Sequence, residues 1–104
     1  MNKYVKTLFR PDPHNTFDLI QFLSLNAGAY MALNRPVPPS IKKLTSLRTL
    51  ILSYNPGLNL PQWLFNPESL PQLQFLNLGL SNIPNGLITK LREARPGLRV
   101  YSFL

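Results

Sequence analysis

Few side chains in this sequence are suited to catalysis. The only histidine, His14, lies in a Pro-Asp-Pro-His-Asn turn beside Asp12, where an imidazole could accept a proton or bind a metal ion. Either role needs partner groups, and the chain has no second histidine and no cysteine. We therefore interpret His14 as an exposed turn residue, and we expect no metal site.

The acidic residues do not form a catalytic pair either. Asp12, Asp18, Glu68 and Glu93 are scattered along the chain, whereas glycoside hydrolysis needs two carboxylates that flank one bond. The sequence also contains no glycine-rich phosphate loop and no G-x-S-x-G nucleophile motif. These observations predict a protein that is not an enzyme and needs no cofactor, which leaves binding as its function.

Leucines recur in the order L-x-x-L-x-x-L-x-L in two stretches of the chain. These stretches are residues 44–55, LTSLRTLILSYN, and residues 70–82, LPQLQFLNLGLSN. A constant offset of 26 residues relates Leu44, Leu47, Leu50 and Leu52 to Leu70, Leu73, Leu76 and Leu78. The last two leucines of each set share one face of a short strand, because side chains two residues apart point the same way. One such strand buries little, so further copies must stack beside it.

Two more copies of the pattern are present. Upstream, an offset of 27 residues relates the first leucine line to Phe17, Ile20, Leu23 and Leu25; downstream, an offset of 25 relates the second line to Leu98, Tyr101 and Phe103. We therefore expect four strands near residues 23–25, 50–52, 76–78 and 101–103. Residues 17–25 also fit a helix, since apolar residues recur there every three positions, but only a strand keeps the register of the later copies.

A second signature follows each strand. Val37-Pro38, Leu60-Pro61 and Ile83-Pro84 are each followed three residues after the proline by another apolar residue. Proline suits a first helical position, because its φ is already fixed and no N–H is left unsatisfied there. We expect an α-helix over residues 85–95, and only a single turn or a 3₁₀-helix after Pro61, since Pro67 interrupts that segment.

With these features, residues 17–103 resemble the leucine-rich-repeat family. The resemblance implies an α/β repeat fold, a short right-handed leucine-rich-repeat solenoid with a parallel concave sheet of about four short strands. Its repeats would lie near 17–43, 44–69, 70–94 and 95–104, the last one partial, within a leucine-rich repeat domain over 17–104 that follows an N-terminal capping segment over 1–16. The family places an asparagine after each strand. Here Asn55 matches, but Gly28 and Ser81 do not, so the asparagine ladder is predicted to be broken.

In such a solenoid, the residues between the inward leucines line the concave face. The predicted rows are Phe22, Thr49, Phe75 and Val100; then Ser24, Ile51, Asn77 and Ser102; then Asn26, Ser53, Gly79 and Leu104; with Ala27, Tyr54 and Leu80 beyond. Aromatic groups on an almost uncharged surface are typical interface anchors.

We predict a non-enzymatic protein-binding module that uses this face. The predicted contact residues are Phe22, Ile51, Tyr54 and Phe75, with Asn77 and Arg48 providing polar selectivity. In the alternative interpretation, Phe22 and Phe75 tuck sideways or lie under another segment of the chain.

The net charge of +7 favours a rival partner, because a basic surface can hold nucleic acid or an anionic membrane. However, the predicted basic residues of the return side are dispersed and lack interleaved stacking aromatics, so they are more typical of a solvated surface: Lys42, Lys43, Lys90, Arg92 and Arg95. Another protein is therefore the favoured partner, and nucleic acid the disfavoured one.

The last expected strand has no return segment after it. Either further repeats continue from this edge, or a second copy pairs with it to form a homodimer, so structural self-assembly is a further alternative. The first residues contain no apolar run of seven or more, and no stretch reaches transmembrane length. Together with the absence of cysteine, these features predict a cytoplasmic protein, with export by a route other than a cleavable signal peptide left open.

Overall fold

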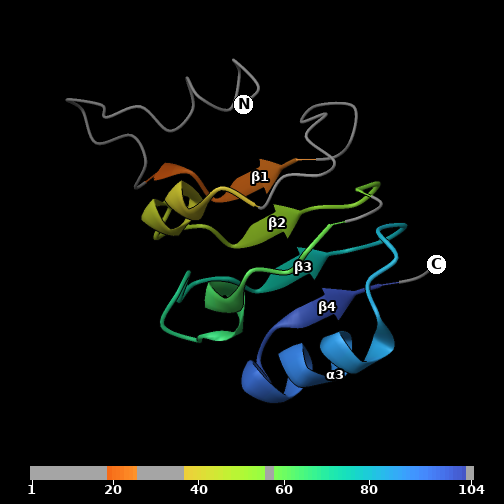
Figure 1. The fold of residues 1–104 in the computed structure, drawn as a ribbon. Helices are drawn as coiled ribbons and strands as arrows, with labels where there is room; N and C mark the ends of the chain where they lie inside the picture. Colours follow the sequence, from red (N-terminus) through yellow and green to blue (C-terminus); the bar gives the residue numbers. More distant parts are fainter. Residues whose placement is uncertain (1–18, 26–36, 56–57, 103–104) are drawn as a thin grey trace.

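The sheet is formed by four three-residue strands, one from each predicted copy of the leucine pattern. The computed structural model describes residues 19–25, 37–55 and 58–102 (Figure 1). The strands are β1 (Phe22–Ser24), β2 (Thr49–Ile51), β3 (Phe75–Asn77) and β4 (Arg99–Tyr101). They pair in parallel in the order β1-β2-β3-β4, so each strand lies beside the next one in the sequence. The described part of the chain is thus a small α/β domain, while the predicted capping segment 1–16 lies outside it.

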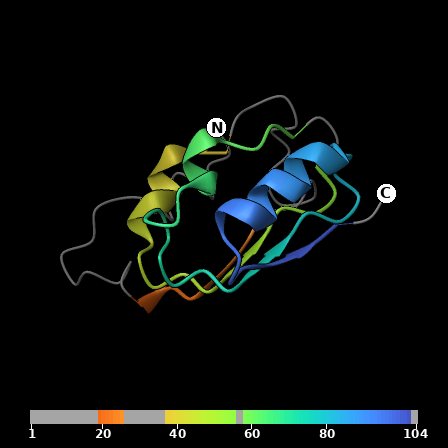
Figure 2. The same ribbon diagram turned by 90° about the horizontal axis from the view of Figure 1, so that it is seen from below.

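The connections between the strands carry the helices, and all of these lie on one side of the sheet (Figure 2). They are the 3₁₀-helices η2 (Pro39–Lys43) and η3 (Gln62–Phe65) and the α-helix α3 (Asn85–Ala94). The predicted difference between a short turn after Pro61 and a true α-helix near 85–95 is confirmed. So is the choice of a strand and not a helix at Phe22–Ser24.

Each helical segment begins immediately after one of the matched prolines. Pro38, Pro61 and Pro84 have φ of −59°, −70° and −57° with extended ψ of 126°, 147° and 139°. They occupy the position before the helix and not the expected first helical position. The proline ring still fixes the φ that leads into the helix, and the extended ψ turns the chain out of the preceding segment.

The α-helix α3 is set by its apolar spacing and by the prolines on either side of it. Its buried residues, Ile88 and Leu91, lie three positions apart and therefore share the face that meets the sheet. At its end the Arg95 N–H still donates to the Leu91 carbonyl at 2.9 Å, and Pro96, which has no N–H, cannot extend the helix.

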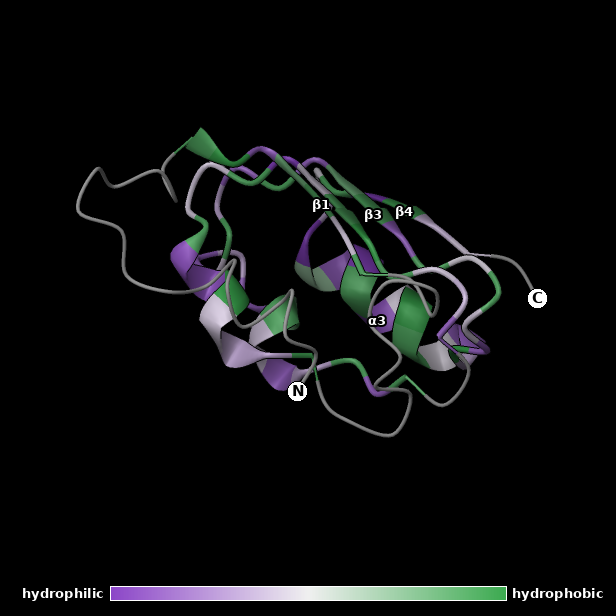
Figure 3. Cartoon of the chain, turned by 90° about the horizontal axis from the view of Figure 1, so that it is seen from above, coloured by the Kyte–Doolittle hydropathy of each residue, from purple (hydrophilic) through white to green (hydrophobic). Residues whose placement is uncertain are grey.

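The hydrophobic core lies between the sheet and the helical segments, where the strands and the middle of α3 are coloured as hydrophobic (Figure 3). The repeated leucines of the second and third copies are all buried there, and Leu44, Leu47, Leu50, Leu76 and Leu78 have no exposed surface. Ile41, Leu64 and Leu91 complete the core from the three helical segments. Because burying a leucine side chain stabilises a fold by roughly 1.5–3 kcal/mol, this layer is the main source of stability.

The strand register matches the predicted one for β1 to β3 and differs at β4. Phe22 pairs with Thr49 and Thr49 with Phe75, as the 27- and 26-residue offsets require. Phe75 then pairs with Arg99, whereas the 25-residue offset had placed Val100 in that row. The predicted rows containing Val100 and Ser102 are therefore wrong by one residue, and the fourth strand, expected near residues 101–103, lies at Arg99–Tyr101.

The physical cause of this shift is the choice of side chain that enters the core. A shift of one residue reverses the facing of every side chain in a strand. In the observed register Val100 packs against the core, while Tyr101 is 50% exposed. The predicted register would have buried the tyrosine with its hydroxyl and exposed the valine. Leu98 is buried like Leu73, its counterpart at the 25-residue offset. The shift of one residue therefore arises after Leu98, because the segment from Leu98 to β4 is shorter than the segment from Leu73 to β3.

A buried polar cluster joins the turns that follow the strands. The Asn55 side-chain amide donates to the carbonyls of Leu25, Leu52 and Ser53 at 2.7, 2.8 and 3.1 Å. In the next unit Ser81 stands where an asparagine was expected, and its hydroxyl donates to the Leu52 carbonyl at 2.8 Å and accepts the Asn55 N–H at 3.1 Å. Ser81 thus joins the turn after β3 to the turn after β2 with a side chain shorter than that of asparagine. Gly28, the other position without an asparagine, lies outside the described residues.

Arg95 occupies the place of a leucine, one 25-residue offset beyond Leu70, and it is buried. Its Nη1 donates to the carbonyls of Leu64, Asn66 and Ser69 at 3.1, 3.3 and 2.8 Å, and its Nη2 donates to the Leu70 carbonyl at 2.7 Å. Desolvation by burial lowers the pKa of the guanidinium, yet an arginine stays protonated at neutral pH. The prediction that Arg95 belongs to an exposed basic surface is therefore wrong.

None of the helices in the described ranges combines the length and the apolar character that crossing a bilayer would require.

Replacing Arg95 by leucine restores the leucine pattern but should destabilise the fold. Among the described residues, the substitution removes the one side-chain donor to the Leu64 and Ser69 carbonyls, and unsatisfied buried acceptors cost roughly 1–3 kcal/mol each. We expect Arg95→Leu to lower the free energy of unfolding by about 2–4 kcal/mol in urea titrations followed by circular dichroism. The exposed Lys90→Leu, as control, should change it by less than about 0.5 kcal/mol. A stability of Arg95→Leu equal to that of the wild type would contradict this role.

Candidate binding face

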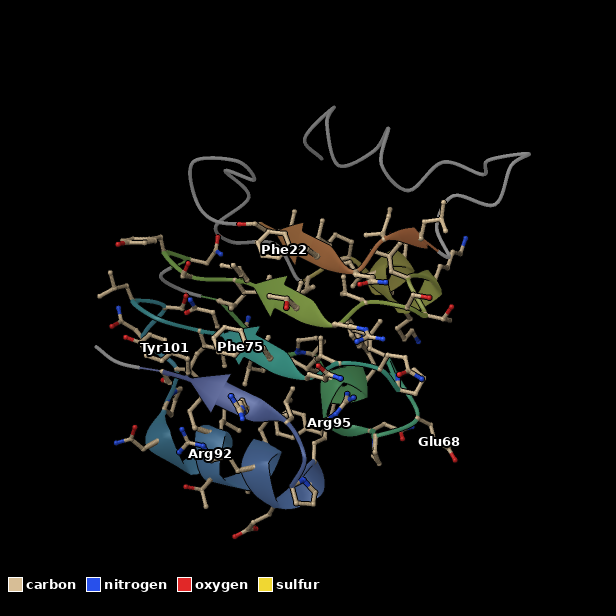
Figure 4. All side chains as sticks on the ribbon, turned by 180° about the vertical axis from the view of Figure 1, so that it is seen from behind. Phe22, Glu68, Phe75, Arg92, Arg95 and Tyr101 are labelled. Carbon is tan, nitrogen blue, oxygen red and sulfur yellow. The ribbon has the colours of Figure 1, made fainter. Side chains whose placement is uncertain are left out.

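The sheet face opposite the helical segments is open in the described part of the chain, and we call it the open face. Figure 4 views it directly and shows Phe22, Phe75 and Tyr101 standing on it. The strand register arranges its side chains in two rows. The Phe22 row contains Phe22, Thr49, Phe75 and Arg99, and the Ser24 row contains Ser24, Ile51, Asn77 and Tyr101.

Four of the six predicted contact residues lie together on the strands of the open face. Phe22 is 60% exposed, while Phe75, Ile51 and Asn77 are half-buried. The central leucine of each of these strands, which points to the opposite side, is buried. The exposed aromatic of β1 is therefore held by a backbone whose other side is fixed in the core, and Phe75 is supported in the same way on β3.

The other two predicted residues lie at opposite ends of β2. Arg48 is exposed immediately before the strand, and its carbonyl accepts the Gln74 and Phe75 N–H groups at 2.8 and 3.0 Å. Tyr54 is 56% exposed in the turn after the strand, with a left-handed φ of 59°. Its N–H donates to the Gly79 carbonyl at 3.0 Å, which fixes the turn. These two residues thus lie just before and just after β2 and do not belong to the rows of the open face.

Asn77 offers a partner only part of its amide. Its Oδ1 accepts the Gly79 N–H at 2.9 Å, which closes the turn after β3. The acceptor is therefore occupied within the chain, and the NH₂ group is the part suited to contact a partner. The predicted role of Asn77 in polar selectivity narrows to that of a hydrogen-bond donor.

The structure adds two residues to the open face that the sequence prediction did not place there. Arg99 is exposed at the end of the Phe22 row, and Tyr101 ends the Ser24 row. The signal that could have found them is the alternation Arg99-Val100-Tyr101, with one β-branched apolar residue between two side chains that carry polar groups. Such alternation assigns the valine to the core. Matching Tyr101 to the leucine positions hid this signal.

The charges of the described residues are distributed unevenly. The open face carries Arg99, with Arg48 just before β2, and no acidic residue occurs in either row. The two described acidic residues are exposed elsewhere. Glu68 lies on the loop beside η3 (Figure 4), and Glu93 lies on α3. The two rows of the open face therefore contain one positive charge and no negative charge, whereas the sequence prediction had them almost uncharged.

The other exposed basic side chains of the described residues lie on the helical segments. Lys42 and Lys43 end η2, and Lys90 and Arg92 are exposed on α3. Arg92 is engaged with the last strand, since its Nη2 donates to the Val100 carbonyl at 2.9 Å. These residues come from separate elements, and none of them lies in a row of the open face.

The described residues contain no group of three or more His, Cys, Asp or Glu side chains that could hold a metal ion. The catalytic candidates His14 and Asp12, which the sequence prediction set aside, lie outside the described residues. Comparisons with protein-family models and with curated proteins find no match for this chain.

Two separate variants, Val100→Asp and Tyr101→Asp, test the strand register that determines which side chains lie on the open face. Val100→Asp should lower the free energy of unfolding by about 2–4 kcal/mol, because it places a carboxylate against the core. Tyr101→Asp, at a half-exposed site, should cost at most about 1 kcal/mol. Urea titrations of both variants measure the difference. The register expected from the 25-residue offset predicts the opposite order.

Proposed function

We propose that the chain is a short leucine-rich-repeat solenoid and that it binds another protein, without catalysis, through the open face as its concave side. The observation that carries this proposal is the Phe22 row, in which two phenylalanine side chains stand on the side of the sheet away from the core. Phe22 is 60% exposed, so a monomer lacks much of the stabilisation that burial of this side chain would give. A partner that covers Phe22 would provide that burial.

The repeat interpretation is supported by the way in which the units depend on one another. Equivalent leucines separated by 26 residues are paired across β2 and β3, and Asn55 and Ser81 bond to the carbonyl of Leu52 from successive turns. Arg95 makes the same kind of connection to the previous return segment. In a solenoid, most stabilising contacts are made between such neighbouring units.

A binding role is supported by the rigidity of the open face. Its side chains stand on strands whose inward residues are buried, so few backbone degrees of freedom remain to be ordered on association. Aromatic anchors held in this way give affinity at low entropic cost. The flanking groups, Thr49, Ser24 and the amide of Asn77, are small or polar and provide hydrogen bonds between the anchors.

Nucleic acid and anionic membranes are less well supported as partners. The lysines that the structure describes lie on η2 and α3, on the other side of the sheet, and Arg95 is buried. Binding to a phosphate backbone relies on many cationic contacts along one surface. The open face carries Arg99, which is enough to recognise an individual carboxylate.

Serine substitutions of the two phenylalanines test the proposed function. The tagged wild-type chain should capture a protein from native extract, identified by mass spectrometry, and Phe22→Ser with Phe75→Ser should reduce its capture at least about tenfold. The far-ultraviolet circular dichroism spectrum should be unchanged, because neither side chain is fully buried. Lys90→Ser, on α3, is the matched control and should bind as the wild type does. Undiminished capture by the doubly substituted chain would contradict a binding role for the open face.

Self-assembly through β4 is a second candidate, favoured by the position of this strand at the end of the sheet order. The Arg99 N–H and the Tyr101 carbonyl bond toward β3, so the backbone groups of Val100 between them face outward. An edge of this kind can pair with another chain. Arg92 opposes this pairing, because its guanidinium already binds the outward Val100 carbonyl.

Removal of the Arg92 side chain tests whether it blocks pairing at this edge. If β4 is able to associate, Arg92→Ala should shift the sedimentation coefficient toward that of a dimer at concentrations where the wild type is monomeric. Lys90→Ala serves as the control for loss of one positive charge from α3. A concentration series in which Arg92→Ala and the wild type sediment alike would rule out assembly through β4.

A further inference from the structure

One arginine, Arg99, shares the Phe22 row of the open face with Phe75, and a second, Arg48, lies just before β2. The Arg48 carbonyl accepts the Phe75 N–H at 3.0 Å. Both arginines are exposed. Since β3 lies between β2 and β4, the register neighbours of Phe75 in the Phe22 row are Thr49 on one side and Arg99 on the other.

Among the described residues, no carboxylate lies in a row with Arg99 on the open face. Neither row contains an aspartate or glutamate, and the two described acidic residues, Glu68 and Glu93, lie on the loop beside η3 and on α3. A guanidinium presents a planar fork of N–H donors that fits a carboxylate with two parallel hydrogen bonds. Because the described residues offer no carboxylate on this face, a complementary partner would have to contribute the acidic group.

We propose that the partner presents an extended acidic segment to the open face, with one apolar residue placed against Phe22 and one aspartate or glutamate placed against Arg99. This inference rests on the proposed function, which it deepens by naming the chemistry of the partner. The apolar residue covers the most exposed aromatic of the face, and the carboxylate binds Arg99.

The register sets the spacing of these two residues in the partner. Phe22 and Arg99 are separated by three strand-to-strand steps, and at about 4.8 Å per step this distance is roughly 14 Å. An extended peptide advances about 3.3 Å per residue, so it covers that distance in about four residues. Side chains four positions apart point to the same side of an extended chain. The recognition pattern is thus an apolar residue and an acidic residue about four positions apart.

Selection from a phage-displayed library of random 12-residue peptides tests this pattern, because every spacing of apolar and acidic residues is offered to the open face at once. Peptides enriched on the wild-type chain should carry an aspartate or glutamate about four residues from an aromatic or aliphatic residue. A fluorescein-labelled member of the enriched set then serves as the probe, and its dissociation constant is measured by fluorescence anisotropy.

Charge reversal separates the role of Arg99 from a general effect of charge. Arg99→Glu should weaken binding of the probe at least about tenfold, whereas Lys90→Glu on α3, with the same change in charge, should alter it less than about twofold. A probe whose acidic residue is replaced by lysine should regain affinity for Arg99→Glu. This rescue would not occur if the substitution had merely damaged the fold.

The results also distinguish failure of this inference from failure of the proposed function. Enriched peptides without acidic residues, bound equally well by Arg99→Glu but lost with Phe22→Ser, would overturn the acidic segment and leave protein binding by the open face intact. Peptide binding unaffected by both substitutions would overturn the two proposals together. Tighter binding of a twelve-residue oligothymidylate than of any selected peptide would also overturn the inference, and would assign the arginines to phosphate recognition.

Discussion

The structure depends on leucine side chains that can be buried only between a three-residue strand and the helical segment that follows it. No single strand of this length has enough apolar surface to remain ordered by itself. Leu50 and Leu76 have no exposed surface because each is covered by its own return segment and by the strands beside it. This dependence on neighbours fixes which residues point inward, and the open face consists of the residues left between them.

Backbone groups are satisfied by side chains wherever the chain changes direction. Asn55 and Ser81 bond the carbonyls exposed at the turns after the strands, and Arg95 bonds the carbonyls of the segment that returns from η3. A buried carbonyl without a donor would be as costly as a lost hydrogen bond. The polar residues at these positions therefore belong to the architecture, whereas Arg99 is exposed in the Phe22 row.

Much of the fold could be predicted because the leucine spacing indicates directly which side chains lie on the same face of the sheet. The offsets of 27 and 26 residues gave the register of β1 to β3, and with it the places of Phe22, Ile51, Phe75 and Asn77. β4 could not be placed in the same way. There, Tyr101 and Val100 competed for one interior position, and only packing against the core decided in favour of the valine. Arg95 was misplaced because no sequence pattern shows that several carbonyls converge on a leucine position.

The central claim is that the open face, set by the buried leucines, is the surface that meets a partner. A two-dimensional NMR titration of the ¹⁵N-labelled chain with a peptide selected on it tests this claim most directly. The account predicts chemical-shift changes concentrated at the amides of Phe22, Thr49, Phe75 and Arg99, with the amides of α3 little affected. Changes concentrated on α3, around Lys90 to Glu93, with the four strands unaffected, would contradict it.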